Sequence, residues 1–392
     1  MRARANAMRI LFVITGLDYG GAERMLLNLV VRLAPSHEIV VVSLTERGPM
    51  AADFERLGAR VIALGMRGPH AMPSAVLRLV GHMRTIRPDV TSTWMYHADL
   101  VGGLATRLAG LPGPAWGIHN GDLSIESTKR LTRAVIRLNA RLSGALPRLI
   151  ICCSHAARRM HVEQGYRDDR FMVIPNGFDM ERFRPSDDAR RWLRAELGLP
   201  ADAVLVGLVA RWHPVKDHAG FLRAASLVSR THPGTHYLLV GSECDAANAA
   251  LVALVESAGL TGRVHLLGAR DDIARVTAAL DVAVSSSTGE AFPNVLGEAM
   301  SCGVPCVTTD VGDSAHIVGD TGRIVQPRDP QALAVALAEV VGMPRAGRLE
   351  LGRRARARIR DNFELGHVSA LYEDAFGALL QPRRARARGM DA

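Results

Sequence analysis

Two glutamates, Glu290 and Glu298, are separated by seven residues in the segment STGEAFPNVLGEAM, which follows a β-branched apolar run. This order predicts that Glu290 lies in a loop after a strand, and that Pro293 starts a helix on which Glu298 faces the same cleft. A carboxylate can accept hydrogen bonds from two ribose hydroxyls at once. The helix would begin with free amides that can bind phosphate, at Phe292, Asn294 and Val295. The alternative is that Glu290 only favours the helix start and Glu298 is an exposed helix residue.

Two glycines, Gly20 and Gly21, stand between another apolar run and a helix-like segment. Glycine lets the backbone approach a phosphate closely and places a helix start beside it. The spacing is not that of the dinucleotide-binding fingerprint, so a tight turn is the alternative.

Two histidines follow predicted strands and so are expected to point into a cleft. His119, with Asn120 next to it, ends one strand, and His97 follows the run that ends at Trp94. Single histidines are often structural, and we expect a site role more for His119 than for His97.

The chain contains only two lysines, Lys129 and Lys216, so nearly all its positive charge is arginine. Codon bias accounts for most of this scarcity. Lys216 lies five residues after Arg211 in the segment ARWHPVKD. A solvated surface lysine is the alternative to a functional one.

The elements that would position these residues form two sets of strands separated by helix-length segments, which predicts two doubly wound α/β domains with parallel sheets. In such folds, ligands bind at the carboxyl ends of strands. The first set of predicted strands is 10–14, 39–44, 61–64, 90–94, 115–119 and 149–153, and the second is 204–210, 237–241, 264–267, 282–285 and 305–308. The sequence PNGFD from Pro175 predicts a turn-rich boundary between the sets. Residues 351–380 predict a final helix with an apolar stripe, made up of Phe363, Val368, Leu371, Tyr372 and Phe376.

Length and composition narrow the classes of protein. The chain has 392 residues, a formal net charge of +9 and 22% charged residues, which indicates an ordered globular protein of two or three domains. No apolar run approaches the ~20 residues of a membrane span, and we expect no export signal. Five cysteines, two of them adjacent, favour a reducing cytoplasm over a disulfide framework, and their spacing does not suggest a metal site.

A stretch of the first half has no acidic residue between Glu126 and Glu163. Arginines recur there every fourth residue, at 133, 137 and 141, and would form one basic stripe on a helix, while Leu131, Val135, Leu138 and Leu142 would lie on other faces. Such a helix suits anionic lipid headgroups or a phosphorylated acceptor. A solvated face is the alternative. Nucleic acid is less favoured, because no aromatic residues are interleaved for base stacking.

Several motifs resemble those of the retaining family-4 glycosyltransferases (glycosyl transferases group 1). The donor-site resemblance covers the paired glutamates, the GVPC strand entry at Gly303, the TDVG loop from Thr309 to Gly312 and a closing GDTG. GGAERMLLNLV resembles the family's N-terminal glycine loop, VIPNGFDMERFRP its linker, and VARWHPVKDHAGFLRA its phosphate-binding segment. The resemblance covers nearly the whole chain.

This resemblance implies the GT-B fold, in which two Rossmann-like domains face each other across a cleft and a C-terminal helix crosses back. The implied domains are an acceptor-binding domain at 8–178, a nucleotide-sugar-binding domain at 179–355, a crossover helix at 356–380 and a basic tail at 381–392. The implied catalytic residues are Glu290, His119, Arg211 and Lys216. The implied donor-binding residues are Glu298, Gly20, Gly21, Phe292, Pro293, Asn294, Val295 and Arg270. The implied acceptor-binding residues are His97 and Asn120.

In this interpretation, Arg211 and Lys216 hold the diphosphate, Glu298 holds the ribose and Glu290 faces the transferred sugar. A fixed arginine and lysine can stabilise the leaving diphosphate without a metal, and no D-x-D sequence occurs. The sequence departs from the family pattern at Gly312-Asp313, followed by His316, and at Gly241-Ser242-Glu243-Cys244. These departures leave the identity of the nucleotide and the sugar open.

The sequence therefore predicts a retaining hexosyltransferase that uses a UDP- or GDP-sugar and a glycan or lipid-linked acceptor in bacterial polysaccharide or glycoconjugate synthesis. No cofactor or metal and no nucleic acid is expected. We expect it in the cytoplasm, with an anionic membrane surface as a further partner. The alternatives are a nucleotide-sugar epimerase of the same architecture and a sugar-binding protein without catalysis.

Overall fold

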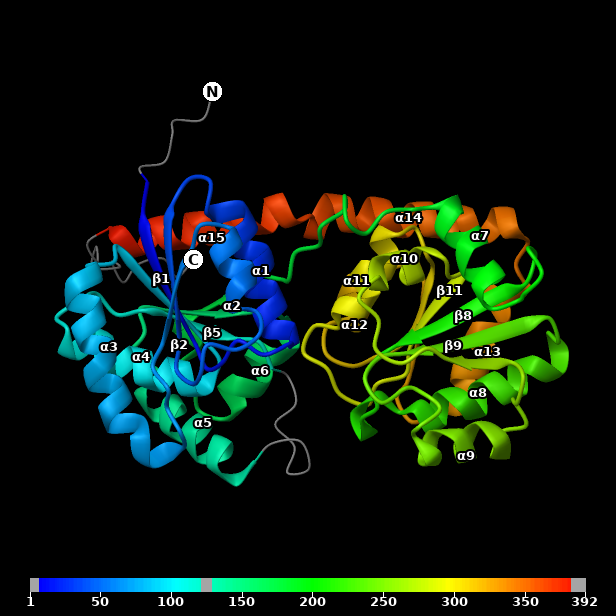
Figure 1. Ribbon diagram of the computed structural model, residues 1–392, viewed down its shortest axis with the longest axis horizontal. Coiled ribbons are helices and arrows are strands. Elements are labelled where there is room, and N and C mark those ends of the chain that lie inside the picture. Colours follow the sequence, from blue (N-terminus) through cyan, green and yellow to red (C-terminus); the bar gives the residue numbers. More distant parts are fainter. Residues whose placement is uncertain (1–6, 121–128, 382–392) are drawn as a thin grey trace, which may run out of the picture.

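The computed structural model describes residues 7–120 and 129–381, so the predicted basic tail lies outside the described residues except for Gln381. Figure 1 shows two α/β domains side by side, with two C-terminal helices running along one edge of both. The described helices include none with the length and apolar character needed to cross a bilayer.

The N-terminal domain is built on a parallel sheet of seven strands. Its elements in chain order are β1 (Arg9–Ile14), α1 (Gly21–Leu33), β2 (Glu38–Ser43), α2 (Ala51–Arg56), β3 (Arg60–Ala63), η1 (Pro69–Ala71), α3 (Met72–Ile86), β4 (Val90–Trp94), α4 (Tyr96–Leu108), β5 (Ala115–Ile118), α5 (Arg130–Leu142), β6 (Leu149–Cys152), α6 (His155–Glu163), η2 (Asp168–Arg170) and β7 (Phe171–Val173). The strand order is β3-β2-β1-β4-β5-β6-β7. This order reverses between β1 and β4, so loops after these two strands leave the sheet in opposite directions and leave a crevice.

The C-terminal domain repeats this topology with six strands in the order β10-β9-β8-β11-β12-β13. Its elements are α7 (Asp187–Glu196), β8 (Val204–Val209), η3 (Pro214–Lys216), α8 (His218–Thr231), β9 (Thr235–Val240), α9 (Ala249–Ser257), β10 (Val264–Leu266), α10 (Ile273–Ala278), β11 (Val282–Ser285), α11 (Asn294–Ser301), β12 (Cys306–Thr309), α12 (Ser314–Val318), β13 (Arg323–Val325) and α13 (Pro330–Gly342). The predicted pair of doubly wound parallel sheets is confirmed. Two edge strands of three residues each, β7 and β13, were not predicted.

The C-terminal segment forms two helices, α14 (Arg345–Phe363) and α15 (Leu365–Leu380), where the sequence predicted one. Glu364 has an extended backbone, breaks the helix and caps α15 through its carboxylate. The crossing therefore occurs at Glu364, and the predicted boundary at 355/356 falls inside α14. The predicted stripe is also divided at this break.

The two halves of the stripe pack on different domains. Val368, Tyr372 and Phe376 are buried against β1 and β4 of the N-terminal domain. Phe363, by contrast, contacts the ring of Phe292 in the C-terminal domain, with ring centroids 5.9 Å apart. Burial of each large apolar side chain stabilises the packing by about 1.5–3 kcal/mol, so α15 fastens the end of the chain to the N-terminal domain.

The linker between the domains packs closely on α11. The Phe178 ring lies against Gly297, where an added Cβ would come within 2.1 Å of the ring. A side chain at position 297 would therefore push the linker away from α11.

A second contact joins the domains at α6. The Asp313 carboxylate of the C-terminal domain accepts hydrogen bonds from the amides of His155 and Ala156, at 2.8 and 2.9 Å. A carboxylate at a helix N-terminus is a favourable interaction, so this departure from the family pattern has a structural role in the apposition of the domains.

Candidate active site

The carboxyl ends of both sheets face each other across a pocket of about 400 Å³, called here the interdomain pocket. It is lined by Gly21, Ala22, His119, Asn120, Cys153, Asn176, Arg211, His213, Val215, Lys216 and residues 289–295. The structure thus brings most of the predicted site residues to one place, from segments far apart in the sequence.

Arg211 and Lys216 enter the pocket from the segment after β8, at the point where the strand order of the C-terminal sheet reverses. The His213 side chain accepts a hydrogen bond from the Val215 amide at the start of η3. Asp217 ends this turn with a left-handed φ of +46° and caps α8 by accepting from the Gly220 amide at 2.9 Å. These local bonds fix the direction in which Lys216 leaves the turn.

Glu290 lies in the loop after β11 and pairs with Lys216, whose Nζ is 2.5 Å from Glu290 Oε1. The Ser287 hydroxyl donates to the same oxygen at 2.8 Å. Gly312 supports this loop from behind, because an added Cβ there would lie 2.5 Å from the carbonyl oxygen of Glu290. Arg211, in contrast, is exposed and has no ion pair in the described part of the chain.

The N-terminus of α11 opens into the pocket. The sequence predicted that Pro293 starts this helix. In the structure the helix begins at Asn294, and Pro293 is the residue just before it. The first amides of a helix have no intrahelical partner, so they remain available to an anion. Asn176 of the linker donates its Nδ2 to Asn294 Oδ1 at 2.8 Å, which ties the linker to this helix start.

The start of α1 forms the opposite wall. Gly21 and Ala22 line the pocket, and Gly20 is the residue just before the helix. An added Cβ on Gly21 would lie 3.9 Å from Asn294 Nδ2, so the first turns of α1 and α11 approach each other across the pocket. The pocket therefore has a helix N-terminus on each side.

His119 lines the pocket from the end of β5, with its ring stacked on Trp94 at 4.0 Å between centroids and 7° between planes. The Tyr372 ring of α15 also stacks with Trp94, and the two ring centroids are 6.2 Å apart. Neither ring nitrogen of His119 has a hydrogen-bond partner among the described residues. Burial lowers the pKa of His119 from 6.5 to about 3, so the ring is neutral near pH 7. A neutral ring without partners can donate one hydrogen bond to a ligand and accept one.

Glu298 lies on α11 but does not line the interdomain pocket. It borders a narrower cavity with Val209, Thr277 and Val295, behind the helix start. Burial raises the pKa of Glu298 from 4.5 to about 7, and Arg182 and Arg24 oppose this increase.

Two predicted site residues lie elsewhere. Arg270 pairs with Glu196 at 2.7 Å and Asp272 at 2.8 Å and packs over the Trp192 ring, outside the interdomain pocket. His97 is half-buried in the first turn of α4 and does not line the pocket, and burial lowers its pKa. For His97, the position after a strand was therefore not sufficient to bring the side chain into this pocket.

Among the pocket residues that were not predicted from the sequence, Asn176, His213 and Cys153 have side chains that can form hydrogen bonds. Asn176 lies in the PNG turn that was interpreted only as a boundary, and His213 lies between Arg211 and Lys216. Cys153 follows β6, so the rule that parallel strands end at the ligand site would have indicated it.

The basic helix of the N-terminal domain differs from the prediction on one point. Arg137 and Arg141 are exposed on α5, and Val135 is buried. Leu131 and Leu138 are 46% and 42% exposed, so they share the solvent side with the arginines instead of lying on other faces. The outward face of α5 is therefore both basic and apolar.

Comparisons with known proteins cover both domains. Residues 19–182 match the family described as Glycosyltransferase Family 4, and residues 203–342 match Glycosyl transferases group 1. EpsF of Bacillus subtilis, named as a glycosyltransferase, is 28% identical over 357 residues, which are 87% of this chain and 90% of EpsF. The UDP-Gal:alpha-D-GlcNAc-diphosphoundecaprenol alpha-1,3-galactosyltransferase of Escherichia coli is 27% identical over 64% of this chain and 66% of its own. The crystal structure of Anabaena HepE in complex with UDP and glucose is 25% identical, with a TM-score of 0.81 over 95% of this chain and 100% of HepE.

Proposed function

The chain belongs to the group 1 and family 4 glycosyltransferases and has the GT-B fold, and from this premise we propose that it moves a hexosyl unit from a UDP-sugar to a glycan or lipid-linked acceptor with retention of the anomeric configuration. It is a nucleotide-sugar-dependent enzyme. The proposal places it in bacterial polysaccharide or glycoconjugate synthesis.

The observation that carries the proposal is that the two domains contribute different kinds of groups to the interdomain pocket. The C-terminal domain contributes two cations and the N-terminus of α11, and the N-terminal domain contributes the start of α1 and His119. One wall therefore suits a diphosphate, and the other offers neutral hydrogen-bonding groups to a sugar and an acceptor hydroxyl.

The relatives favour UDP over GDP as the nucleotide. The HepE structure contains UDP and glucose, and the name of the E. coli relative specifies UDP-galactose and a diphosphoundecaprenol acceptor. In the proposed complex, the diphosphate lies between Arg211, Lys216 and the first amides of α11. Ionised Glu298 would accept from the ribose hydroxyls.

The chemical step breaks the bond from the anomeric carbon to the β-phosphate oxygen, and the bond electrons stay on that oxygen. Arg211, Lys216 and the α11 amides stabilise the charge that develops there. The acceptor oxygen bonds to the same face of the anomeric carbon and passes its proton to the leaving phosphate. Two protein cations supply the stabilisation, so we propose transfer without a metal.

The sugar would lie between Glu290 and His119. In the unliganded pocket Glu290 is paired with Lys216. When the diphosphate engages Lys216, a Glu290 oxygen becomes available to accept from a ring hydroxyl. His119 keeps its orientation through the Trp94 stack and would hydrogen-bond the sugar from the opposite wall, while Asn120 beside it faces the acceptor.

The test is a donor screen followed by product analysis. We expect UDP-sugars, and not GDP-sugars, to raise the melting temperature, because a ligand that binds only the folded state stabilises it. Proton NMR of the first-formed product should show the anomeric configuration of the donor, with turnover unchanged by EDTA. An inverted product would refute retention, a preference for GDP-sugars would refute the donor assignment, and sugar conversion without an acceptor would indicate an epimerase.

The outward face of α5 supports a second part of the proposal, that the enzyme works in the cytoplasm at an anionic membrane surface. The exposed residues Arg137, Arg141, Leu131 and Leu138 combine charge with apolar area, which suits adsorption to a lipid headgroup layer. The five cysteines are buried free thiols, in keeping with a reducing compartment.

Sedimentation with vesicles that contain phosphatidylglycerol tests this part. The double variant Arg137→Gln/Arg141→Gln should bind these vesicles several-fold more weakly than wild type, because each basic residue near the surface contributes about 1 kcal/mol. The matched control is Arg78→Gln/Arg84→Gln on the exposed side of α3, which should bind as wild type does. Equal losses in both variants, or no binding by wild type, would refute the assignment to α5.

A further inference from the structure

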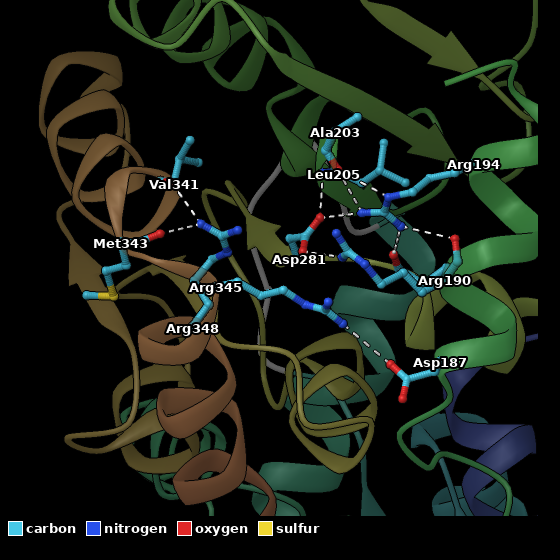
Figure 2. Close-up of polar contacts among 11 residues, drawn as sticks. Asp187, Arg190, Arg194, Ala203, Leu205, Asp281, Val341, Met343, Arg345 and Arg348 are labelled. Carbon is cyan, nitrogen blue, oxygen red and sulfur yellow. Dashed lines mark hydrogen bonds and ion pairs between the residues drawn. The ribbon is translucent and has the colours of Figure 1, made fainter. Parts of the chain in front are cut away.

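A second pocket, of about 270 Å³, lies on the C-terminal domain between α7 and α14 and shares no lining residue with the interdomain pocket. We call it the arginine pocket. Its charged lining residues are Asp187, Arg190, Asp281, Arg345, Arg348, Arg353 and Arg356. Figure 2 shows Arg190 extending from α7, and Arg345 and Arg348 from α14, around Asp281. Basic residues thus outnumber acidic ones on its wall.

Both oxygens of the most buried carboxylate in the pocket already have partners. Asp281 pairs with Arg190 through one oxygen. Its other oxygen accepts from Arg194 Nη2 at 2.5 Å and from the Leu205 amide at 2.8 Å. Asp281 therefore holds α7 to the sheet, and the partners of both its oxygens are groups other than Arg345 and Arg348.

Arg348 has no carboxylate partner in the described structure, although it is only 8% exposed. Its Nη1 donates to the carbonyl oxygens of Val341 at 2.9 Å and Met343 at 2.6 Å, and its Nε has no partner. A buried guanidinium with an unused donor is costly unless an anion completes it.

The neighbours of Arg348 add to the positive potential. Burial lowers the pKa of Arg348, Asp281 opposes this, and the charges of Arg190 and Arg345 lower the pKa further. The three guanidinium groups therefore repel one another, and the nearby Asp281 carboxylate is already paired with Arg190 and Arg194.

A long and exposed ion pair between Arg345 and Asp187 lies at the mouth of the pocket. Arg345 Nη2 lies 3.6 Å from Asp187 Oδ1, and both side chains are more than half exposed, at 57% and 80%. An exposed pair of this length contributes little to stability, so Arg345 can exchange Asp187 for another anion at little cost. The lining also includes apolar side chains, among them Leu280, Pro305 and Leu349.

We propose that the arginine pocket binds a phosphate group, either as inorganic phosphate or on a small phosphomonoester, between Arg190, Arg345 and Arg348. A phosphate presents several acceptor oxygens and two negative charges, which suits guanidinium donors converging from two helices. The apolar side chains of the lining would contact the organic part of an ester. The site goes beyond the proposed transfer reaction and does not depend on it.

Occupancy of this site would affect the hinge between the domains. Arg356, one turn further along α14 than Arg353, donates to the linker carbonyls of Met180 and Phe183, at 3.3 and 3.1 Å. A phosphate that fastens α7 to α14 therefore restrains the helix that holds the linker. We expect ligand binding to stabilise the C-terminal domain and to slow domain movement.

The experiment is calorimetric titration of the full chain with inorganic phosphate and, separately, with glucose 1-phosphate. All titrations are performed with saturating UDP and repeated in the Lys216→Met variant, which removes a phosphate ligand of the interdomain pocket. Wild type and Lys216→Met should bind phosphate alike. Arg345→Met and Arg348→Met should each weaken it about tenfold or more, as expected for loss of a charge-assisted hydrogen bond.

The control is Arg360→Met, which removes an exposed arginine that pairs with Asp361 on the same helix and should leave affinity unchanged. Circular dichroism verifies folding, and Arg345→Met keeps the test valid if the buried Arg348 variant does not fold. Tighter binding of glucose 1-phosphate than of phosphate identifies an ester as the ligand, and equal affinity identifies the free ion. The proposal is overturned if wild type binds neither, if binding is lost in Lys216→Met alone, or if Arg345→Met and Arg360→Met behave alike.

Discussion

The interdomain pocket and the arginine pocket are both lined with cationic side chains, but the ion pairs of these side chains differ in how deeply they are buried. In the interdomain pocket Arg211 is exposed and has no carboxylate partner among the described residues, and Lys216 and Glu290 remain 24% and 15% exposed. In the arginine pocket, the lining pair Arg190–Asp281 is more deeply buried, with 15% and 5% exposed, and Arg194, the second partner of Asp281, is 2% exposed. The first pocket lies between two domains, and the second is formed within one.

The difference follows from what each region stabilises. A buried carboxylate with two guanidinium partners contributes to the fold, since loss of one member leaves an uncompensated buried charge. A pair that lies in an open pocket, where water reaches part of both side chains, costs less to break than an enclosed one, which suits a site whose groups must change partners when a ligand enters. Substitutions should therefore affect stability in one pocket and activity in the other.

The largest expected effect is that of Asp281→Asn on folding. It leaves Arg190 and Arg194 without their carboxylate, so the free energy of unfolding should fall by about 3–5 kcal/mol. Glu290→Gln, the corresponding change in the interdomain pocket, should cost less, about 1–2 kcal/mol, because water in the open pocket can solvate Lys216 when its carboxylate is lost. Urea denaturation monitored by circular dichroism measures both. The comparison fails if the two variants lose similar stability.

Next in size is the effect of Lys216→Met on catalysis. Removal of one fixed charge from a developing phosphate anion should reduce kcat by about 10²–10³-fold. Lys129→Met, which changes the only other lysine at the exposed start of α5, is the matched control. Steady-state release of UDP measures both rates, and wild-type turnover of Lys216→Met would remove this residue from the proposed site.

The pH dependence of Glu298 gives a third test. Its folded-state pKa, about 7, is above the ordinary value of 4.5, so the folded protein retains a proton that the unfolded chain loses. Stability should therefore fall as pH rises from 4.5 to 7, by up to about 3 kcal/mol at ~1.4 kcal/mol per pKa unit. Glu298→Gln remains neutral, so its stability relative to wild type should rise across this window and then level off.

Binding of UDP by Glu298→Gln distinguishes a role of Glu298 in ribose binding from a role in the stability of the fold alone. If ionised Glu298 holds the ribose, wild-type affinity for UDP should increase as pH rises through 7, and the affinity of the variant should be lower and independent of this titration. Isothermal titration at pH 6 and 8 measures both. A variant that binds UDP as wild type does would leave Glu298 with a structural role alone.

The sequence predicted the sheets well because the buried parallel strands are short runs rich in β-branched and apolar residues between helix-length segments, as at Val90–Trp94 and Val282–Ser285, whose bounds agree with the structure. It predicted much of the interdomain pocket because strand ends determine where loops meet. Arg270, which the resemblance implied as a donor-binding residue, does not line this pocket and pairs with Glu196 and Asp272. The partner of a surface arginine depends on tertiary packing, which a local motif does not record.

The arginine pocket was not predicted for a related reason. Its members come from α7, the loop before β11 and α14, and they meet only after the C-terminal domain has closed around its sheet. In a chain with two lysines, an additional arginine carries little information by itself. Only the structure shows that Arg348 is buried and lacks a carboxylate.

The smallest expected effect concerns the pair Arg345–Asp187 and tests whether the two pockets differ as sharply as proposed. A double-mutant cycle of Arg345→Met and Asp187→Asn should give a coupling energy for folding below about 0.5 kcal/mol, because both side chains are mostly hydrated. In the phosphate titration, however, Asp187→Asn should bind more tightly, since the competing carboxylate is gone. A coupling of several kcal/mol would instead make Arg345 a structural residue like Arg194 and would extend the fold-stabilising role to the mouth of the arginine pocket.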